Sequence, residues 1–165
     1  MTTLKDLLAA GGIVAVLMLS LVAISSQTGL AQSDPFVGTW VLNVAKSTYT
    51  PGPPPKNQTS IYEAAGQGVK VTTKGTGADG QPTSTQFTAN YDGKDSPVTG
   101  NPDWDATALK RIDTYTVEFT RKRAGKVVQT GSNVVSKDGK TRTVTTKGVD
   151  AKGRQINNIA VYEKK

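Results

Sequence analysis

The sequence predicts an all-β protein, an antiparallel up-and-down barrel of eight to ten strands. From residue 58 onward, apolar and polar residues alternate with the two-residue period of half-buried strands. Asp-Gly pairs and single glycines interrupt this alternation at short intervals, and they supply the positive φ angles that tight hairpins need. An open sheet of so many strands would expose two edges, and closure into a barrel removes both.

The first 31 residues differ from the rest of the chain. Residues 7–24 form an uncharged apolar run, and Gly29-Leu30-Ala31 places small residues at the positions that a signal peptidase reads. We therefore expect a signal peptide over residues 1–31, export to the periplasm or the extracellular space, and a barrel domain over residues 34–165. The apolar run is also near the minimum length for spanning a bilayer, so an uncleaved anchor in the inner membrane stays open as the alternative.

The first strand is expected within residues 36–44, where Trp40 and Leu42 share one face of a two-residue pattern. Gly38 allows the backbone to bend or to pass close to a bulky group at a barrel end. We therefore expect Gly38 and Trp40 to be structural, barrel-closing residues, with Trp40 beneath the last strand near Tyr162.

A proline-rich connection follows over residues 46–56, with half of the chain's eight prolines. Proline lacks an amide donor and disfavours helix at the residue before it. We expect an extended, polyproline-like crossing over the surface or across one barrel end. A stiff connector, a ligand-gating flap and a docking site for a proline-recognising domain are the three interpretations.

Eight further strands are expected along the rest of the chain, separated mostly by glycine-containing turns. They cover residues 58–65, 68–74, 83–91, 106–112, 114–122, 126–136, 140–147 and 154–163. Segment 71–81 aligns with segment 144–154, and each copy has the pattern of a strand, a hairpin turn and a strand. Duplication and convergence on the same hairpin chemistry both explain this repeat.

The chain contains no histidine and no cysteine. This composition removes the commonest general base, the usual zinc ligands, thiol nucleophiles and disulfides. Asp103 and Asp105 flank Trp104 and suggest a carboxylate pair or an oxygen-ligand metal site, but aspartates in a Gly/Pro-rich loop more often form turns. We expect no enzyme, no catalytic residues, no metal site and no cofactor.

Binding inside the barrel is the function that remains. Several residues expected to face inward are small and leave room for a ligand, namely Thr83, Thr85, Ala89, Ala106, Ala108, Gly131 and Ala160. Aromatic side chains would orient a small hydrophobic guest, and the candidate ligand contacts are Tyr62, Phe87, Tyr91, Tyr115, Phe119 and Tyr162. A core packed solid with side chains is the alternative to a cavity.

The formal net charge of +7 belongs to the chain after the leader, because Lys5 and Asp6 cancel. The only tight basic cluster is Arg121-Lys122-Arg123, and a nucleic-acid reader would concentrate its cations on one face among aromatics. We therefore expect no nucleic-acid partner. We also expect a monomer, with no stable membrane insertion after signal cleavage. The alternative function is a surface or structural envelope module whose cluster at 121–123 contacts polyanions.

The sequence also resembles known families. Phe36-Val37-Gly38-Thr39-Trp40-Val41-Leu42 resembles the Gly-x-Trp opening strand of the calycins, which include the lipocalins and the fatty-acid-binding proteins, and Ile159–Lys164 resembles the closing strand of the latter. Residues 34–165 also resemble small exported bacterial lipocalin-like proteins, through the order of segments 38–40, 46–47, 51–55, 91–95 and 97–100.

This resemblance implies the barrel and a small hydrophobic ligand. Fatty-acid-binding proteins hold a carboxylate with Arg-x-Tyr on the closing strand, where this chain has Ala160-Val161-Tyr162. Tyr162 matches and the arginine does not, so carboxylate binding is not implied. Lipocalins stack a late basic side chain on the motif tryptophan, and Arg154 and Lys164 are the candidates for that contact with Trp40.

Overall fold

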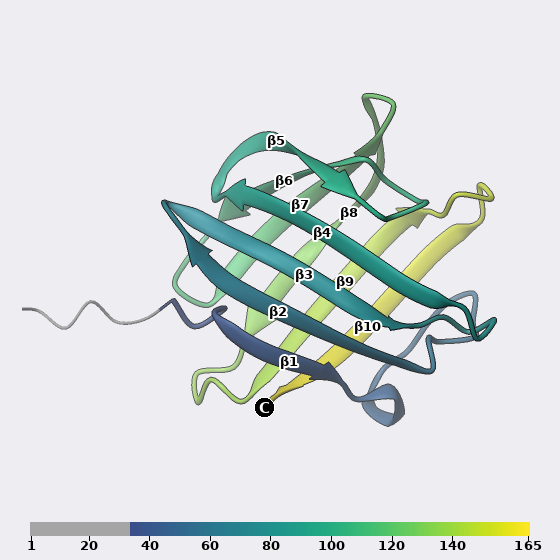
Figure 1. Ribbon diagram of the computed structural model, residues 1–165, viewed down its shortest axis with the longest axis horizontal. Coiled ribbons are helices and arrows are strands. Elements are labelled where there is room, and N and C mark those ends of the chain that lie inside the picture. The colour runs from purple at the N-terminus through teal and green to yellow at the C-terminus, as the bar shows by residue number, and fades with distance from the viewer. Residues whose placement is uncertain (1–33) are drawn as a thin grey trace, which may run out of the picture. The chain divides into compact units, whose positions relative to one another are not determined.

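The computed structural model describes residues 34–165, which form a closed antiparallel barrel of ten strands (Figure 1). The strands are β1 (Gly38–Leu42), β2 (Asn57–Ala65), β3 (Gly68–Thr76), β4 (Pro82–Asn90), β5 (Asp92–Thr99), β6 (Ala106–Arg111), β7 (Thr116–Arg123), β8 (Lys126–Val135), β9 (Thr141–Val149) and β10 (Gln155–Lys164). The predicted all-β up-and-down barrel is confirmed. The expected signal peptide lies outside the described residues.

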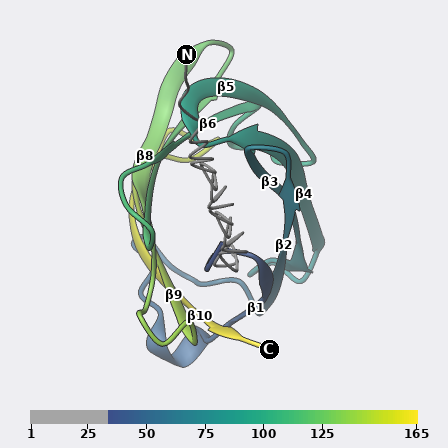
Figure 2. The same cartoon turned by 90° about the vertical axis from the view of Figure 1, so that its left-hand side faces the viewer.

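The strand β1 closes the barrel. It is the shortest of the ten strands, and it pairs with β10 on one side and with β2 on the other. Trp40 lies opposite Lys164 of β10 and Ser60 of β2. Each remaining strand pairs with the strand before it in the chain, as a meander requires. Figure 2 looks along the barrel, with β2, β3 and β4 on one side of the interior and β8, β9 and β10 on the other.

The strand β5 (Asp92–Thr99) was not among the strands expected from the sequence. Asp92 and Gly93 do form a turn, in which Asp92 Oδ1 accepts the Lys94 amide at 3.0 Å and Gly93 adopts a φ of +79°. The chain leaves this turn directly as a strand that pairs with β6 but meets β4 only at Gln86–Thr99 and Phe87–Val98. Turn residues and Pro97 are unusual inside paired strands, so the sequence did not indicate β5. This strand pairs with β4 at only two positions.

The first strand is also shorter than expected. It ends at Leu42, and residues Val44–Lys46 form one turn of 3₁₀ helix, η1, which is capped by Asn43 Oδ1, the acceptor of the Lys46 amide at 3.1 Å. Among residues 34–165 no helix is long and apolar enough to cross a bilayer.

One barrel end is closed by aromatic side chains. Trp40 is fully buried, and its Nε1–H donates to the Phe36 carbonyl at 2.8 Å. Lys164 Nζ lies 5.0 Å from the centre of the Trp40 ring, so of the two candidates it is Lys164 that contacts this ring. Arg154 pairs instead with Asp150.

The proline-rich connection lies near the other barrel end. Before the prolines, Thr48 bridges to Ile159 of β10, and the Asn157 amide donates to the Thr50 carbonyl at 2.8 Å. Tyr49 and Pro55 then line the barrel interior. The segment therefore crosses part of the barrel end, as one of the two sequence-based placements proposed.

Candidate ligand-binding cavity

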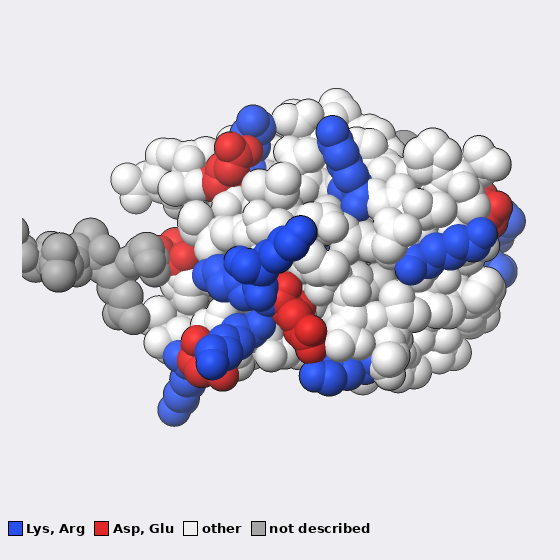
Figure 3. All heavy atoms as spheres, turned by 60° about the horizontal axis from the view of Figure 1, so that its bottom comes forward, with Lys and Arg blue, Asp and Glu red and all other residues white. Residues whose placement is uncertain are grey.

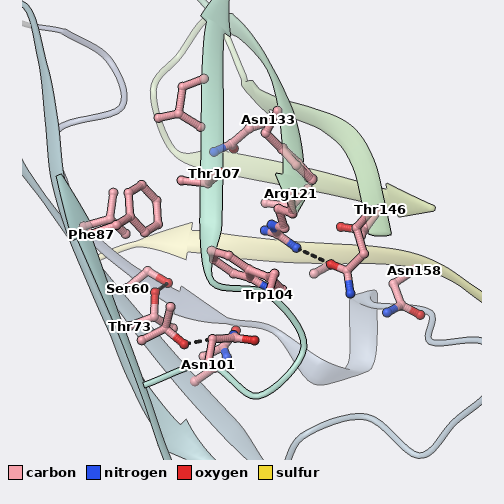
Figure 4. A pocket seen from close by; sticks show the side chains of 18 of the residues that line it. Ser60, Thr73, Phe87, Asn101, Trp104, Thr107, Arg121, Asn133, Thr146 and Asn158 are labelled. Carbon is pink, nitrogen blue, oxygen red and sulfur yellow. Dashed lines mark hydrogen bonds between the residues drawn. The ribbon is translucent and has the colours of Figure 1, made fainter. Parts of the chain in front are cut away.

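The barrel is hollow between its two ends. It encloses a cavity of about 280 Å³, lined by side chains from most of the ten strands and by the connections 43–56 and 100–105 (Figure 4). This volume is close to the lower end of small-molecule pockets, which begin at about 300 Å³. The centre of the barrel is therefore a cavity and not a solidly packed core.

Five of the six aromatic residues proposed as ligand contacts line this cavity. They are Tyr62, Phe87, Tyr91, Phe119 and Tyr162. Tyr115 does not, because it precedes β7 and packs against the edge of the core, so its placement among the contacts was wrong. Sequence reasoning missed Phe36, Tyr49 and Trp104 as lining residues. Tyr49 and Trp104 enter the interior from connections, where strand periodicity gives no signal, whereas Phe36 shares the parity of Trp40 but precedes β1.

The small residues expected to face inward divide into two groups. Thr85 and Ala160 line the cavity, and Gly131 leaves space for Phe119, whose ring would lie 2.6 Å from a Cβ at that position. On β6 the expected register is wrong by one residue. Thr107 and Leu109 line the cavity, so Ala106 and Ala108 lie on the opposite face of the strand.

Thr83 and Ala89 do not line the cavity either. Thr83 is exposed near the start of β4. Ala89 is buried and belongs to the packed core near the closed barrel end. Both lie on the expected face of β4, so the strand's alternation was predicted correctly while the position of the cavity along the strand was not.

Arg142 of β9 forms the buried cationic centre of the cavity. Only 2% of its surface is exposed, and its Nη1 donates to the Tyr62 hydroxyl at 2.7 Å. The Arg142 guanidinium carbon lies 4.2 Å from the ring centre of Tyr162 and 4.6 Å from that of Tyr62. These contacts hold the cation on aromatic faces and leave its Nε without a hydrogen-bond partner.

The charge of Arg142 is not neutralised by protein. Among the described residues, no carboxylate lies within ion-pair distance of this guanidinium. A buried cation costs several kcal/mol unless an opposite charge or a full set of hydrogen bonds compensates it. An anion in the cavity would supply that compensation.

The Tyr62 hydroxyl completes the donor set. Its oxygen accepts from Arg142 and, at 3.4 Å, from Asn133 Nδ2, which leaves its own proton free to donate into the cavity. Asn133 is 8% exposed, and its Oδ1 has no partner. Unpartnered polar atoms that are this well buried are uncommon in folded proteins.

Tyr162 connects this centre to the neighbouring strands. It lies opposite Arg142 across the β9–β10 ladder, and its hydroxyl donates to Gln58 of β2. Burial raises the pKa of Tyr162 even though the positive charge of Arg142 acts in the opposite direction. Burial likewise raises the pKa of Tyr49 and of Tyr91, so all three remain neutral hydroxyls at physiological pH.

Arg142 lies on the strand next to the closing strand, directly opposite Tyr162. Sequence reasoning missed Arg142, because charged residues of a strand are usually assigned to its wet face. The signal was its parity, since Arg142, Val144 and Thr146 alternate on one face of β9 and all three line the cavity.

Arg121 of β7 also points into the cavity, so its assignment to an outer basic cluster was wrong. Its guanidinium carbon lies 4.2 Å from the Phe119 ring centre and 4.4 Å from that of Trp104, and Nη1 donates to Gln129 Oε1 at 3.0 Å. Burial lowers the pKa of Arg121 to about 10, which leaves it charged at neutral pH.

The other two residues of that cluster lie differently. Lys122 pairs with Asp95 at 2.6 Å, and Arg123 is exposed. Figure 3 shows that basic side chains on one face of the molecule are interspersed with acidic ones. The three consecutive cations therefore do not form one outer patch.

The two aspartates beside Trp104 act as loop anchors. Asp103 Oδ1 accepts the Ala151 amide at 2.7 Å, and Asp105 Oδ2 accepts the Ala124 amide at 2.9 Å. These bonds tie the β5–β6 connection to two other loops and hold Trp104, 6% exposed, against Arg121 and Phe87. Among residues 34–165 no cluster of acidic side chains has the arrangement of a metal site.

Comparisons with known proteins give a distant structural likeness. No family model and no curated protein match the chain. The chain is similar to the crystal structure of zebrafish ileal bile acid-binding protein complexed with cholic acid, with 12% sequence identity and a TM-score of 0.45, over 79% of this chain and 98% of that chain. This likeness is too distant to transfer a ligand.

Proposed function

We propose that this protein is a non-enzymatic binding barrel that takes a small amphipathic organic acid into its interior. The observation that carries the proposal is Arg142, a buried and unneutralised cation whose Nε faces no protein partner. The acid group would accept from Arg142 and from the Tyr62 hydroxyl, since charge-assisted hydrogen bonds are the strongest type available there.

The remaining walls favour a compact, partly aromatic body. Phe87, Phe119 and Trp104 provide apolar surface, while Thr107, Asn133 and Thr146 place polar groups around it (Figure 4). A purely hydrophobic ligand would leave these polar groups and two arginines desolvated, at a cost of about 1–3 kcal/mol for each unsatisfied group. The cavity volume favours one or two rings over a long acyl chain.

Binding, not catalysis, is what these side chains support. The Arg142 guanidinium and the Tyr62 hydroxyl donate hydrogen bonds that hold and orient an anion, and Tyr162, whose pKa burial raises, keeps its proton at neutral pH.

Calorimetric titration with 2-naphthoate and with the neutral 2-naphthalenemethanol tests the proposal. We expect the acid to bind at least about tenfold more tightly than the alcohol, and Arg142→Met to remove most of that difference, because a hydrogen bond to a charged group contributes about 1.5–3 kcal/mol. Lys147→Met is the matched control, since it removes one charge from the exposed side of the same strand. Equal affinity for acid and alcohol, or an Arg142→Met variant that still discriminates between them, would reject the proposal.

We also propose that the chain is exported after cleavage behind Ala31 and acts as a monomer. The uncharged run over residues 7–24 and the small residues before the cleavage position support export. A mature protein that begins at Gln32 by mass spectrometry is the expected result, and a retained leader would favour the membrane-anchored alternative. The outer-surface alternative loses support, because Arg121 is internal and Lys122 is paired.

A further inference from the structure

Arg121 is a second cation in the same cavity, and a single acid group at Arg142 leaves it unexplained. Aromatic rings of Phe119 and Trp104 lie within 4.5 Å of its guanidinium carbon, which removes water from those sides. Its one side-chain hydrogen bond within residues 34–165 is the donation from Nη1 to Gln129. Its Nε and Nη2 therefore remain available as donors.

Gln129 holds this guanidinium in place. The Gln129 side chain is 3% exposed, and its Nε2 donates to the Val149 carbonyl at 3.2 Å, so its Oε1 is fixed toward Arg121. A fixed acceptor and two ring contacts orient the arginine fork in advance, which is the arrangement that suits recognition of a planar acid.

The two arginines enter the cavity at different levels. Arg121 lies opposite Gln129 near the start of β8, whereas Arg142 lies opposite Val135 at its end. At about 3.3 Å per residue, these backbone positions are roughly 20 Å apart along β8. Both side chains line the same cavity and enter it from these two levels.

Asp103 makes no ion pair with Arg121. Its Oδ1 accepts the Ala151 amide, and no ion pair within 4 Å joins it to Arg121 among the described residues, although its more distant charge partly offsets the lowering of the Arg121 pKa by burial. The interior therefore holds two separate cations, each with free donors and each next to aromatic surface.

We propose that Arg121 forms a second anion subsite and that the ligand class is an aromatic molecule with two acidic groups, one at Arg142 and one at Arg121. This proposal rests on the proposed function, because it requires the acid subsite at Arg142. Phe87, Phe119 and Trp104 would contact the ring system between the two acid groups.

Matched pairs of acids test the second subsite. The probes are 2-naphthoate against naphthalene-2,6-dicarboxylate, and biphenyl-4-carboxylate against biphenyl-4,4′-dicarboxylate, titrated calorimetrically into the wild-type protein at pH 7. We expect at least one dicarboxylate to bind about tenfold or more tightly than its monocarboxylate, as one added charge-assisted contact predicts.

Variants assign that gain to a residue. Arg121→Met should abolish the dicarboxylate gain, so that each dicarboxylate binds no more tightly than its monocarboxylate. Arg123→Met, which removes an exposed charge from the same strand, should change neither affinity. Circular dichroism checks that each variant keeps the barrel, and the comparison within each pair on the wild-type protein decides the question even if Arg121→Met does not fold.

The outcomes separate the two proposals. If monocarboxylates bind through Arg142 and no dicarboxylate binds more tightly, the second subsite is rejected and the proposed function stands. If monocarboxylate binding depends equally on Arg121 and Arg142, the two arginines share one acid group, and the second subsite is again rejected. If no acid binds, both proposals are rejected.

Discussion

At the scale of single residues, Trp40 has a structural position, whereas Trp104 lies in the candidate binding cavity. Trp40 is fully buried between Lys164 and Arg142, at the closed end of the barrel and on the shortest strand. Trp104 enters the cavity from a loop and contacts Arg121 and Phe87. The first position supports the closure of the barrel, whereas the second faces the space where a ligand would lie.

We expect Trp40→Ala to lower the free energy of unfolding by about 3–5 kcal/mol, as truncations of large buried aromatics do. The loss has three sources, namely the cavity left behind, the Phe36 carbonyl left without its donor, and the lost contact with Lys164. Urea titration followed by circular dichroism measures it. Trp104→Ala is the matched variant and should cost less, because its ring borders a cavity; a loss below about 1 kcal/mol for Trp40→Ala would contradict this role.

Periodicity predicted the aromatic wall of the site and failed for its cations. Tyr62, Phe87, Phe119 and Tyr162 were correctly placed facing the interior, because an apolar side chain in an alternating strand faces the interior. Arg142 and Arg121 share the parity of such inward residues, but a charged side chain is usually solvated, so composition and parity gave opposite assignments. Burying a charge costs free energy that only specific contacts compensate, and no local sequence pattern identifies those contacts.

At the scale of elements, hairpin turns were the most predictable features and strand register the least. The turns before β4 and β10 both carry a glycine with positive φ, Gly80 at +87° and Gly153 at +75°, as the aligned segments 71–81 and 144–154 indicated. The predicted register of β6 was wrong by one residue, and such a shift exchanges the two faces of the strand. Pairing with β5 and β7 determines that register, and no local pattern reports it.

The turn between β9 and β10 leads to a prediction about how the stability of the protein depends on pH. The Arg154 amide, the Arg154 guanidinium and the Lys152 amide donate to the Asp150 carboxylate, and these bonds, with that of the Arg154 amide largest, hold the Asp150 pKa below its usual value. A pKa lowered by folding contributes stability that is complete above the unfolded value of about 3.9 and is lost as pH falls through the folded value.

We therefore expect Asp150→Asn to be less stable than wild type at pH 7, and the difference between the two proteins to shrink below about pH 4. Urea midpoints measured between pH 2 and pH 8 test this. Glu118→Gln is the control, because Glu118 is exposed and makes no side-chain hydrogen bond or ion pair within residues 34–165. A difference that stays constant across the whole range would show that the Asp150 charge does not stabilise the turn.

At the scale of the whole molecule, the barrel is closed but not uniformly paired. The strands β2 and β3 pair along their full lengths, and β9 and β10 pair from Val149–Gln155 to Thr141–Glu163. The strands β4 and β5 meet only at Gln86–Thr99 and Phe87–Val98. This seam borders Tyr91 and Phe87, which line the cavity, so the least paired part of the wall is also a wall of the proposed binding site.

Local opening should therefore begin at this seam. We expect the amides of β4 and β5 that point into it to exchange with solvent at least roughly tenfold faster than ladder amides between β2 and β3, because opening there breaks few backbone hydrogen bonds. Native-state hydrogen exchange followed residue by residue measures this, with the β9–β10 ladder as a second reference of full pairing. Protection that is equal around the barrel would show that side-chain packing, and not strand pairing, sets the stability of its wall.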